Sequence, residues 1–332
     1  MKKRFALAAV GSVLMTALLA GCAGNASESN SEESMFGQVS GSASEQEATS
    51  EQETTSEQPS ENQDNSKNEE QKPQDDTASS GYDGFKAGTA KAKYTGAGDR
   101  TAYLETSLCL EKGKSYTMDE IISALEGATD YKKSSDPTYT TIDCGSDGVQ
   151  ELLVQTSFDP EFTLYMIIKD INGELTICFD QDGWSRSDVQ VETDGTVMSS
   201  GSGGANVHVW DQAFIDADGE YHFYYGCEET LTLYDSYYLY DKADYKEMSV
   251  DGLDVDHIGI RDYYFEPDYE DRTHYYEYFM LDDNYNDITT DADYDDSNPV
   301  KARFKEYGVD TYSAAQIKDM LDSRAAEIGY SK

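Results

Sequence analysis

The pattern of hydrophobic and polar positions divides the chain into three regions. An apolar run extends from Phe5 to Leu19, directly after three basic residues. A polar region rich in Ser, Glu, Gln, Asn and Thr follows to about residue 80, and short apolar runs separated by turns fill residues 81–332. We expect the third region alone to form a folded domain, because the polar region has too little apolar surface to offset the entropy of ordering.

Residues 81–332 have the pattern of a series of β-hairpins. Runs rich in Tyr, Val, Ile, Thr and Phe alternate with Asp-Gly or Asn-Gly pairs, which tolerate the positive φ angles of tight hairpin turns. These pairs are Asp147-Gly148, Asn172-Gly173, Asp182-Gly183, Asp194-Gly195, Asp218-Gly219 and Asp251-Gly252. The strands are expected at residues 151–158, 162–169, 175–179, 189–192, 207–215, 221–225 and 230–240. The pattern predicts a mainly β domain, an antiparallel meander of hairpins.

Two capping boxes predict two helices in this domain. A Thr with a Glu three residues later opens a short helix near 118–126, and a Ser with a Gln three residues later opens a helix near 314–328. Apolar residues of the C-terminal helix, such as Ile317 and Leu321, recur on one face. This amphipathic helix should therefore pack against the sheet.

The N-terminal region has the features of a secretory signal. Its apolar run of about 15 residues is shorter than the roughly 20 that span a bilayer, and small residues precede the expected cleavage site. The tetrad Leu19-Ala20-Gly21-Cys22 resembles the lipobox of bacterial lipoproteins. The resemblance implies that residues 1–21 are removed and that Cys22 receives a diacylglyceryl group. It also implies that the mature protein is anchored through Cys22 on the extracellular face of the cell membrane, since two or more acyl chains hold a protein stably.

Residues 22–80 are interpreted as a lipid-anchored, disordered acidic tether. As a neutral coil this segment would have an r.m.s. span of about 40 Å, and its like charges extend it further. Such a tether carries the domain away from the lipid. It favours a Gram-positive host, whose lipoproteins must reach through a thick wall.

The chain is strongly acidic, with a formal net charge of −41 at pH 7. Residues 22–80 contain 14 acidic and 2 basic residues and the signal contains three basic residues, which leaves −32 for residues 81–332. This charge repels phosphate backbones and anionic headgroups, so nucleic acid is not an expected partner. Cations, neutral glycans and basic envelope proteins remain candidates. The alternative is that acidity only keeps an extracellular monomer soluble.

One loop has the composition of a metal site. Residues 143–154 resemble the D-x-D-G-D-G-x-x-E-L-x-V loop of FG-GAP-type (VCBS-like) repeats in bacterial surface proteins, with Asp143, Asp147 and Glu151 at carboxylate positions. The resemblance implies calcium, which takes about six to eight oxygen ligands. Gly145 stands where the family has a middle carboxylate, so the alternative is a plain structural turn.

A longer resemblance surrounds this loop. Over residues 193–219 the order of turn, strand, Gly/Ser bend and strand ending in D-x-D-G is similar to that of a family of clostridial lipoproteins. The resemblance covers about residues 138–240. It indicates a fold and implies no particular activity.

The stretch from Asp262 to Asp296 is acidic and rich in tyrosine. Its pairs Tyr263-Tyr264 and Tyr275-Tyr276 place one ring on each face of a strand. Two interpretations stay open: the four rings form a platform on which a sugar stacks, or they pack within the sheet with their hydroxyls reaching water.

Catalytic motifs are not found in the sequence. Neither H-E-x-x-H nor G-x-S-x-G occurs, and the four histidines have no zinc-ligand spacing. The four cysteines after the lipobox, Cys109, Cys144, Cys178 and Cys227, are compatible with disulfides or with buried free thiols. The sequence predicts a monomeric cell-surface lipoprotein, a binding or envelope-associated module rather than an enzyme. The alternatives are a carboxylate-dependent glycan hydrolase and a substrate-capturing lipoprotein of a transporter.

Overall fold

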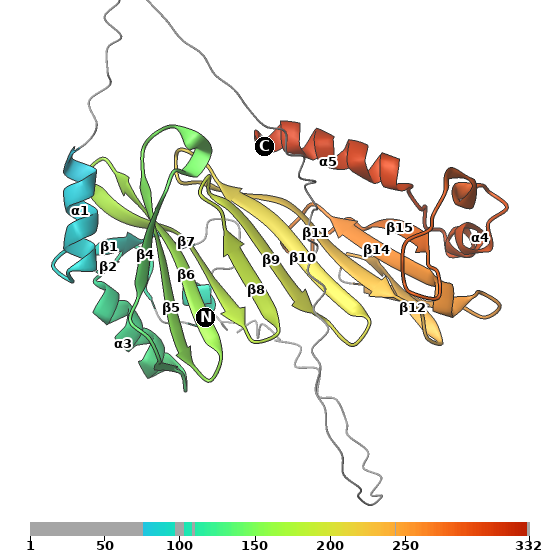
Figure 1. Cartoon of the computed structure of the whole chain (residues 1–332), viewed down its shortest axis with the longest axis horizontal. Helices are drawn as coiled ribbons and strands as arrows, with labels where there is room; N and C mark the ends of the chain where they lie inside the picture. Colours follow the sequence, from blue (N-terminus) through green and yellow to red (C-terminus); the bar gives the residue numbers. More distant parts are fainter. Residues whose placement is uncertain (1–75, 97–102, 108–109, 243, 331–332) are drawn as a thin grey trace, which may run out of the picture. The chain divides into compact units, whose positions relative to one another are not determined.

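The computed structural model describes residues 76–96, 103–107, 110–242 and 244–330 (Figure 1). The lipobox with Cys22, most of the expected tether and Cys109 lie outside the described residues. Among the described residues no helix is both long enough and apolar enough to cross a membrane.

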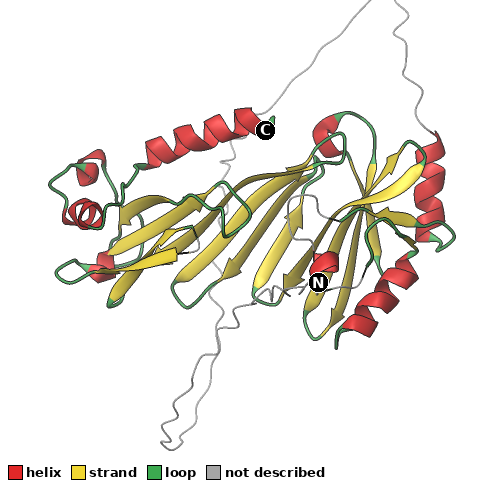
Figure 2. Cartoon of the chain, turned by 180° about the vertical axis from the view of Figure 1, so that it is seen from behind, coloured by secondary structure: helices red, strands yellow, loops and turns green. Residues whose placement is uncertain are grey.

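The fold is mainly β and mostly antiparallel, as the hairpin pattern predicted (Figure 2). The α-helices are α1 (Asp76–Lys86), α2 (Tyr103–Thr106), α3 (Met118–Ala128), α4 (Pro299–Glu306) and α5 (Ala314–Ile328), and the 3-10 turns are η1 (Cys144–Ser146), η2 (Val255–His257) and η3 (Asp291–Tyr294). The first sheet contains β1 (Ala92–Tyr94), β2 (Ser115–Tyr116), β3 (Lys132–Lys133), β4 (Thr138–Ile142), β5 (Glu151–Asp159), β6 (Phe162–Ile171) and β7 (Glu174–Trp184). The second contains β8 (Ser187–Val191), β9 (Thr196–Ser202), β10 (Val207–Ile215), β11 (Tyr221–Leu231), β14 (Ile258–Tyr264) and β15 (Tyr275–Met280). Strands β12 (Ser236–Asp241) and β13 (Asp244–Ser249) form a separate hairpin.

Helices α1 and α3 cover one face of the first sheet (Figure 1). The sheet has the order β2-β1-β7-β6-β5-β3, with β4 also paired to β5, and only the β1–β7 pair is parallel. Phe85 of α1 and Ile121 of α3 pack on Val154, while Leu153 points to the other face. There Leu153 joins Val197 of the second sheet in a smaller core, so the two sheets share apolar contacts.

Helix α5 covers one face of the second sheet, whose order is β15-β14-β11-β10-β9-β8 (Figure 1). Its Ile317 packs against Cys227 and Tyr263, as the amphipathic pattern predicted. The Arg324 guanidinium donates a hydrogen bond of 3.1 Å to the carbonyl of Phe223. Since side chains alternate along a strand, the neighbours of Cys227 and Tyr263 point to the opposite face, which α5 leaves open.

The two predicted capping boxes are confirmed. The hydroxyl of Thr117 accepts from the amide of Glu120, whose carboxylate accepts in return from the Thr117 amide, and Ser313 and Gln316 do the same at α5. Helix α1 begins at Asp76, inside the range expected to be tether. Helix α4 was not predicted, although an N-cap Asn298 before a Pro is a known start signal.

One predicted hairpin turn was wrong. Asp182 and Gly183 lie inside β7, where they pair with Leu164 and Thr163 of β6. The strand continues because β6 offers buried apolar partners up to Phe162, and this favours pairing over turning. The Asp-Gly signal needs positive φ angles, and neither residue adopts one.

The prediction of a single strand over residues 230–240 was wrong as well, because the structure has two strands there. Strand β11 ends at Leu231, β12 begins at Ser236, and Thr232 between them has a φ of 58°. The sequence conceals this break because neither Gly nor Asn marks it. The cysteines within the described residues, Cys144, Cys178 and Cys227, are free thiols.

Candidate functional site

The candidate site is a cavity of about 380 Å³ on the face of the second sheet that α5 leaves open. This volume is within the usual range of small-ligand pockets. The floor comes from neighbouring strands in register: Glu228 of β11 lies opposite Asp262 of β14, and Gly226 lies opposite Tyr264. The walls are formed by Tyr240 of β12 and by the loop between β14 and β15, which supplies Tyr269, Arg272 and His274.

A buried Asp–His pair forms one end of the floor. The Nδ1 of His274 lies 2.7 Å from Oδ2 of Asp262, and each side chain is only 5% exposed. The remaining polar atoms, Oδ1 of Asp262 and Nε2 of His274, are buried and have no hydrogen-bond partner among the described residues. Buried polar atoms in native proteins almost always have a hydrogen-bond partner. Two atoms without one, in residues that line a cavity, indicate a place for ligand or water.

Two carboxyl groups face each other on this floor. Directly opposed residues of an antiparallel pair have Cβ atoms about 4.5–5.5 Å apart, which places the Glu228 side chain beside that of Asp262. Burial raises the pKa of Glu228, and the neighbouring Asp262 charge raises it further. Burial also raises the pKa of Asp262, although the hydrogen bond from His274 and the charge of Arg272 oppose this. Both carboxyl groups therefore have pKa values above their usual ones.

An arginine and an aromatic ring form another wall. The Arg272 guanidinium carbon lies 3.8 Å from the centre of the Tyr264 ring, and the guanidinium donates to the Pro267 carbonyl at 3.2 Å. The Tyr264 ring in turn lies over the backbone of Gly226, where an added Cβ would be 2.3 Å from the ring. Only glycine at this position lets the ring lie flat on the strand.

The cavity continues into a second one of about 450 Å³. Both are lined by Gln181, Asp182, Asp211, Tyr264, Tyr269 and Arg272. The second cavity reaches Tyr103 and Phe223. Its lining comes from β7 of the first sheet as well as from the second, so the site is an open groove rather than a closed pocket.

The four tyrosines that the sequence suggested as a platform do not share a surface. Tyr264 alone lines the cavity, and Tyr276 is 1% exposed in the core beside Phe304. Tyr263 and Tyr275 lie on the opposite face under α5. The alternation of faces was correctly predicted and separates Tyr263 and Tyr275 from Tyr264, whereas Tyr276 shares the face of Tyr264 and is buried in the core.

The sequence analysis did not identify the other residues of the site. Tyr240 and Tyr269 supply aromatic rings, and the Asp262–His274 pair brings together a residue of β14 and one of the loop that leads into β15. Only the register of β11, β14 and β15 reveals this grouping. The signal available beforehand was the run Tyr237-Tyr238-Leu239-Tyr240 of β12, which places large side chains on both faces of the strand.

The loop with Asp143, Asp147 and Glu151 is held by protein groups. Glu151 is fully buried; one of its oxygens bonds the ammonium of Lys169 and the other accepts the Cys144 amide at 2.7 Å. The Asp143 carboxylate accepts a hydrogen bond of 3.1 Å from the Gly148 amide, and the Asp147 carboxylate accepts one of 2.7 Å from a backbone amide of its own turn. The structure thus places the Lys169 ammonium at the buried carboxylate, and each of the other two carboxylates stabilises a turn.

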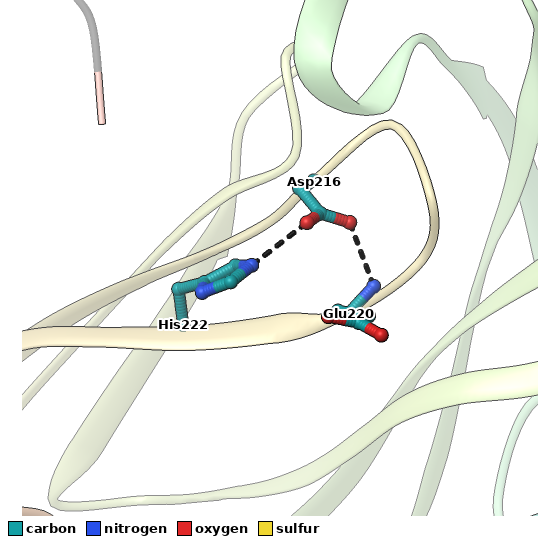
Figure 3. A group of neighbouring side chains, drawn as sticks. All are labelled: Asp216, Glu220 and His222. Atoms are coloured by element: carbon teal, nitrogen blue, oxygen red, sulfur yellow. Dashed lines mark hydrogen bonds and ion pairs between the residues drawn. The ribbon is translucent and has the colours of Figure 1, made fainter. Parts of the chain in front are cut away.

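A different trio lies at the β10–β11 turn (Figure 3). Asp216, Glu220 and His222 have potential ligand atoms within 4.8 Å of one another. The Asp216 carboxylate already accepts from the His222 ring at 2.7 Å and from the Glu220 amide at 2.8 Å. Partial burial raises the pKa of Asp216, but these hydrogen bonds outweigh it and hold the pKa below its usual value. The geometry is that of a turn-stabilising carboxylate.

Among the described residues that line the cavity, the serines lie on β8 and β9, far from the buried histidine. Ser199 has a buried hydroxyl and lines the same cavity, but β10, β11 and β14 lie between its strand and β15, beside which His274 lies. Four strand spacings of about 4.8 Å separate the two residues by roughly 19 Å. The chemistry of the site therefore rests on its carboxyl groups, its histidine and its aromatic rings.

Comparisons with protein-family models, with curated proteins and with solved structures found no match to this chain.

Proposed function

We propose that this protein is a cell-surface lipoprotein whose domain binds a neutral saccharide in the cavity of the second sheet. The proposed location rests on the lipobox resemblance. Cys22 would be the lipid anchor on the extracellular face of the membrane, and residues 22–75 would form the tether. The described residues that line the proposed binding site all belong to the domain.

The lining of the cavity supports a saccharide over other small ligands. Tyr269 and Tyr240 offer aromatic surface to the apolar side of a sugar, and Tyr264, whose ring faces contact Gly226 and Arg272, completes the aromatic lining. Asp262 accepts and Arg272 donates hydrogen bonds, the two roles that sugar hydroxyls require. A phosphorylated or otherwise anionic ligand would meet the acidic groups of the floor and a domain charge of −32, which opposes its approach.

The observation that carries the proposal is the buried Asp262–His274 pair. Its two unpartnered polar atoms, Oδ1 of Asp262 and Nε2 of His274, are buried in residues that line the cavity and have no hydrogen-bond partner among the described residues. A hydroxyl both donates and accepts a hydrogen bond, so the several hydroxyls of a sugar match both a carboxylate oxygen and a ring nitrogen.

The test is isothermal titration calorimetry of residues 23–332 with neutral oligosaccharides of glucose and of N-acetylglucosamine. Asp262→Asn should weaken binding about tenfold or more, the loss expected when one hydrogen bond to a charged group is removed. His257→Gln is the control, because His257 makes a similar pair with Asp283 at 3.0 Å at an exposed position outside the cavity. If Asp262→Asn binds as well as the unmodified protein, the cavity is not the site.

The register of one strand pair favours a second candidate function, glycoside hydrolysis. Retaining glycosidases hold two carboxyl groups about 5–5.5 Å apart, and Glu228 and Asp262 occupy directly opposed positions with raised pKa values. Glu228 would be the acid and Asp262 the nucleophile. Incubation with the saccharides that bind, followed by chromatography of products, separates the two functions: a binding module returns the saccharide intact, and a hydrolase releases shorter products that Glu228→Gln no longer forms.

A further inference from the structure

We infer that the ligand is a glycan chain of several sugar units and that the outer face of the β12–β13 hairpin is its second contact surface. This inference rests on the proposed saccharide function. It assigns a role to tyrosines that lie outside the cavity and that the fold itself does not require.

The hairpin has one buried and one open face. In β12, Tyr237 and Leu239 are 7% and 2% exposed and pack into the core with Phe304 of α4. Tyr238 and Tyr240 alternate with them and therefore point to the other face, where Tyr238 is 46% exposed. Burial of one face fixes the hairpin in place, and its open face carries large rings that do not pack into the core.

The rings on the open face are continuous with the cavity. Tyr240 stacks on His274 with ring centres 5.4 Å apart, and it lies directly opposite Tyr245 of β13 in the register. The Tyr245 ring is 6.4 Å from that of Tyr240 and 5.3 Å from that of Tyr238. A row of ring contacts thus runs from the buried pair through Tyr240 and Tyr245, beside the hairpin turn, to Tyr238 on the open face. Tyr245 is 63% exposed, and no described element covers it.

The shape of this row suits a linear ligand. Tyr238 and Tyr240 are two residues apart on one strand, about 7 Å, and the second cavity extends the groove on the other side of Tyr264 and Arg272. Aromatic side chains in a row stack successive rings of a chain, as they do with successive bases of a single strand. A single sugar would fill the cavity and leave both extensions unused.

The alternative occupant of an exposed acidic and aromatic surface is a basic peptide. A peptide would be held by charge, so its affinity would fall steeply with salt, whereas a neutral glycan would bind almost independently of salt. The absence of a salt dependence is therefore part of the expected result.

The experiment measures the dissociation constants of residues 23–332 for glucose and N-acetylglucosamine oligomers of two to six units, at low and high salt. We expect the affinity to rise at least tenfold over the series. Tyr245→Ala should weaken binding of the six-unit ligand about tenfold and leave that of the two-unit ligand unchanged. Tyr285→Ala is the matched control, because Tyr285 is 62% exposed and does not line the cavity or the hairpin.

The possible failures are distinguishable. If short oligomers bind but length and Tyr245→Ala have no effect, the chain ligand is excluded and the saccharide function stands. If no oligomer binds at any length, both proposals fall. A basic peptide that binds with strong salt dependence and loses affinity in Tyr245→Ala would overturn the glycan assignment. Circular dichroism establishes that each variant is folded, which is expected for substitutions at exposed tyrosines.

Discussion

At the residue scale, the buried ion pair between Glu151 and Lys169 is the interaction whose loss should cost the most. Glu151 is fully buried and the Lys169 side chain is 8% exposed. Burial lowers the pKa of Lys169, but the hydrogen bond and charge of Glu151 outweigh it, so the lysine pKa lies above its usual value. Each charge is therefore stabilised by the other.

We expect Lys169→Met to lower the free energy of unfolding by about 3–5 kcal/mol, because it leaves a buried carboxylate without its counterion. Urea denaturation measures this change. The double variant Lys169→Met/Glu151→Gln should recover a large part of the loss, since a neutral amide needs no counterion. A Lys169→Met variant as stable as the unmodified protein would show that the pair is not buried in solution.

A second residue-scale prediction concerns Glu228 and pH. Its pKa is raised by burial and by Asp262, so the folded state binds a proton more readily than the unfolded state. Ionised Glu228 then lowers stability at pH values above its folded pKa, and this penalty disappears below the unfolded pKa of about 4.3. We expect Glu228→Gln to raise the melting temperature at pH 7 and to leave it unchanged near pH 3. Equal effects at both pH values would exclude an electrostatic cause.

At the scale of elements, the packing of β14 across β11 depends on a missing side chain. An added Cβ at Gly226 would overlap the Tyr264 ring, so Gly226→Ala must displace that ring from the cavity wall. We expect a loss of about 1–3 kcal/mol in stability and weaker saccharide binding in calorimetry. Gly127→Ala in α3 is the control, because a Cβ there meets nothing within 4 Å and alanine favours a helix. If Gly226→Ala retains full affinity, the position of Tyr264 is not important for binding.

The elements also show what the sequence was able to predict. Turns marked by Asp194-Gly195 and Asp218-Gly219 occur where expected, because positive φ at glycine is a local property. The helices at Thr117 and Ser313 were predictable for the same reason, since a capping box is a local contact. Asp182-Gly183 failed because pairing with β6 overrode the local preference.

The candidate site was not predictable in this way. Asp262 and His274 are close only because β14 and β15 pair in one particular register, and Glu228 joins them from β11. Nothing in the sequence distinguishes Asp262 and Glu228 from the many other acidic residues. Tyr264 was singled out correctly, but its separation from Tyr263 depends on which face α5 covers, and Tyr276 is removed from the surface by packing against Phe304.

At the scale of the whole molecule, the acidic charge makes every cation a general stabiliser. A domain with a net charge of −32 repels itself, and any salt weakens that repulsion. A specific calcium site would add to this effect: saturation at about a hundred times the dissociation constant contributes about 2.7 kcal/mol, or roughly 5–10 °C in melting temperature for a domain of this size. The two contributions are separable only at matched ionic strength.

We expect calcium to raise the melting temperature no more than sodium chloride of the same ionic strength, because Glu151 bonds Lys169 and the carboxylates of Asp143 and Asp147 accept from backbone amides of their own turn. The measurement is thermal unfolding of residues 23–332 in EDTA, in millimolar calcium and in matched sodium chloride. A calcium-specific rise that Asp143→Asn abolishes would restore the metal site that the FG-GAP-type resemblance implies, and would require Glu151 to exchange its lysine for the ion. A calcium-specific rise abolished by Asp216→Asn instead would assign the ion to the trio at the β10–β11 turn.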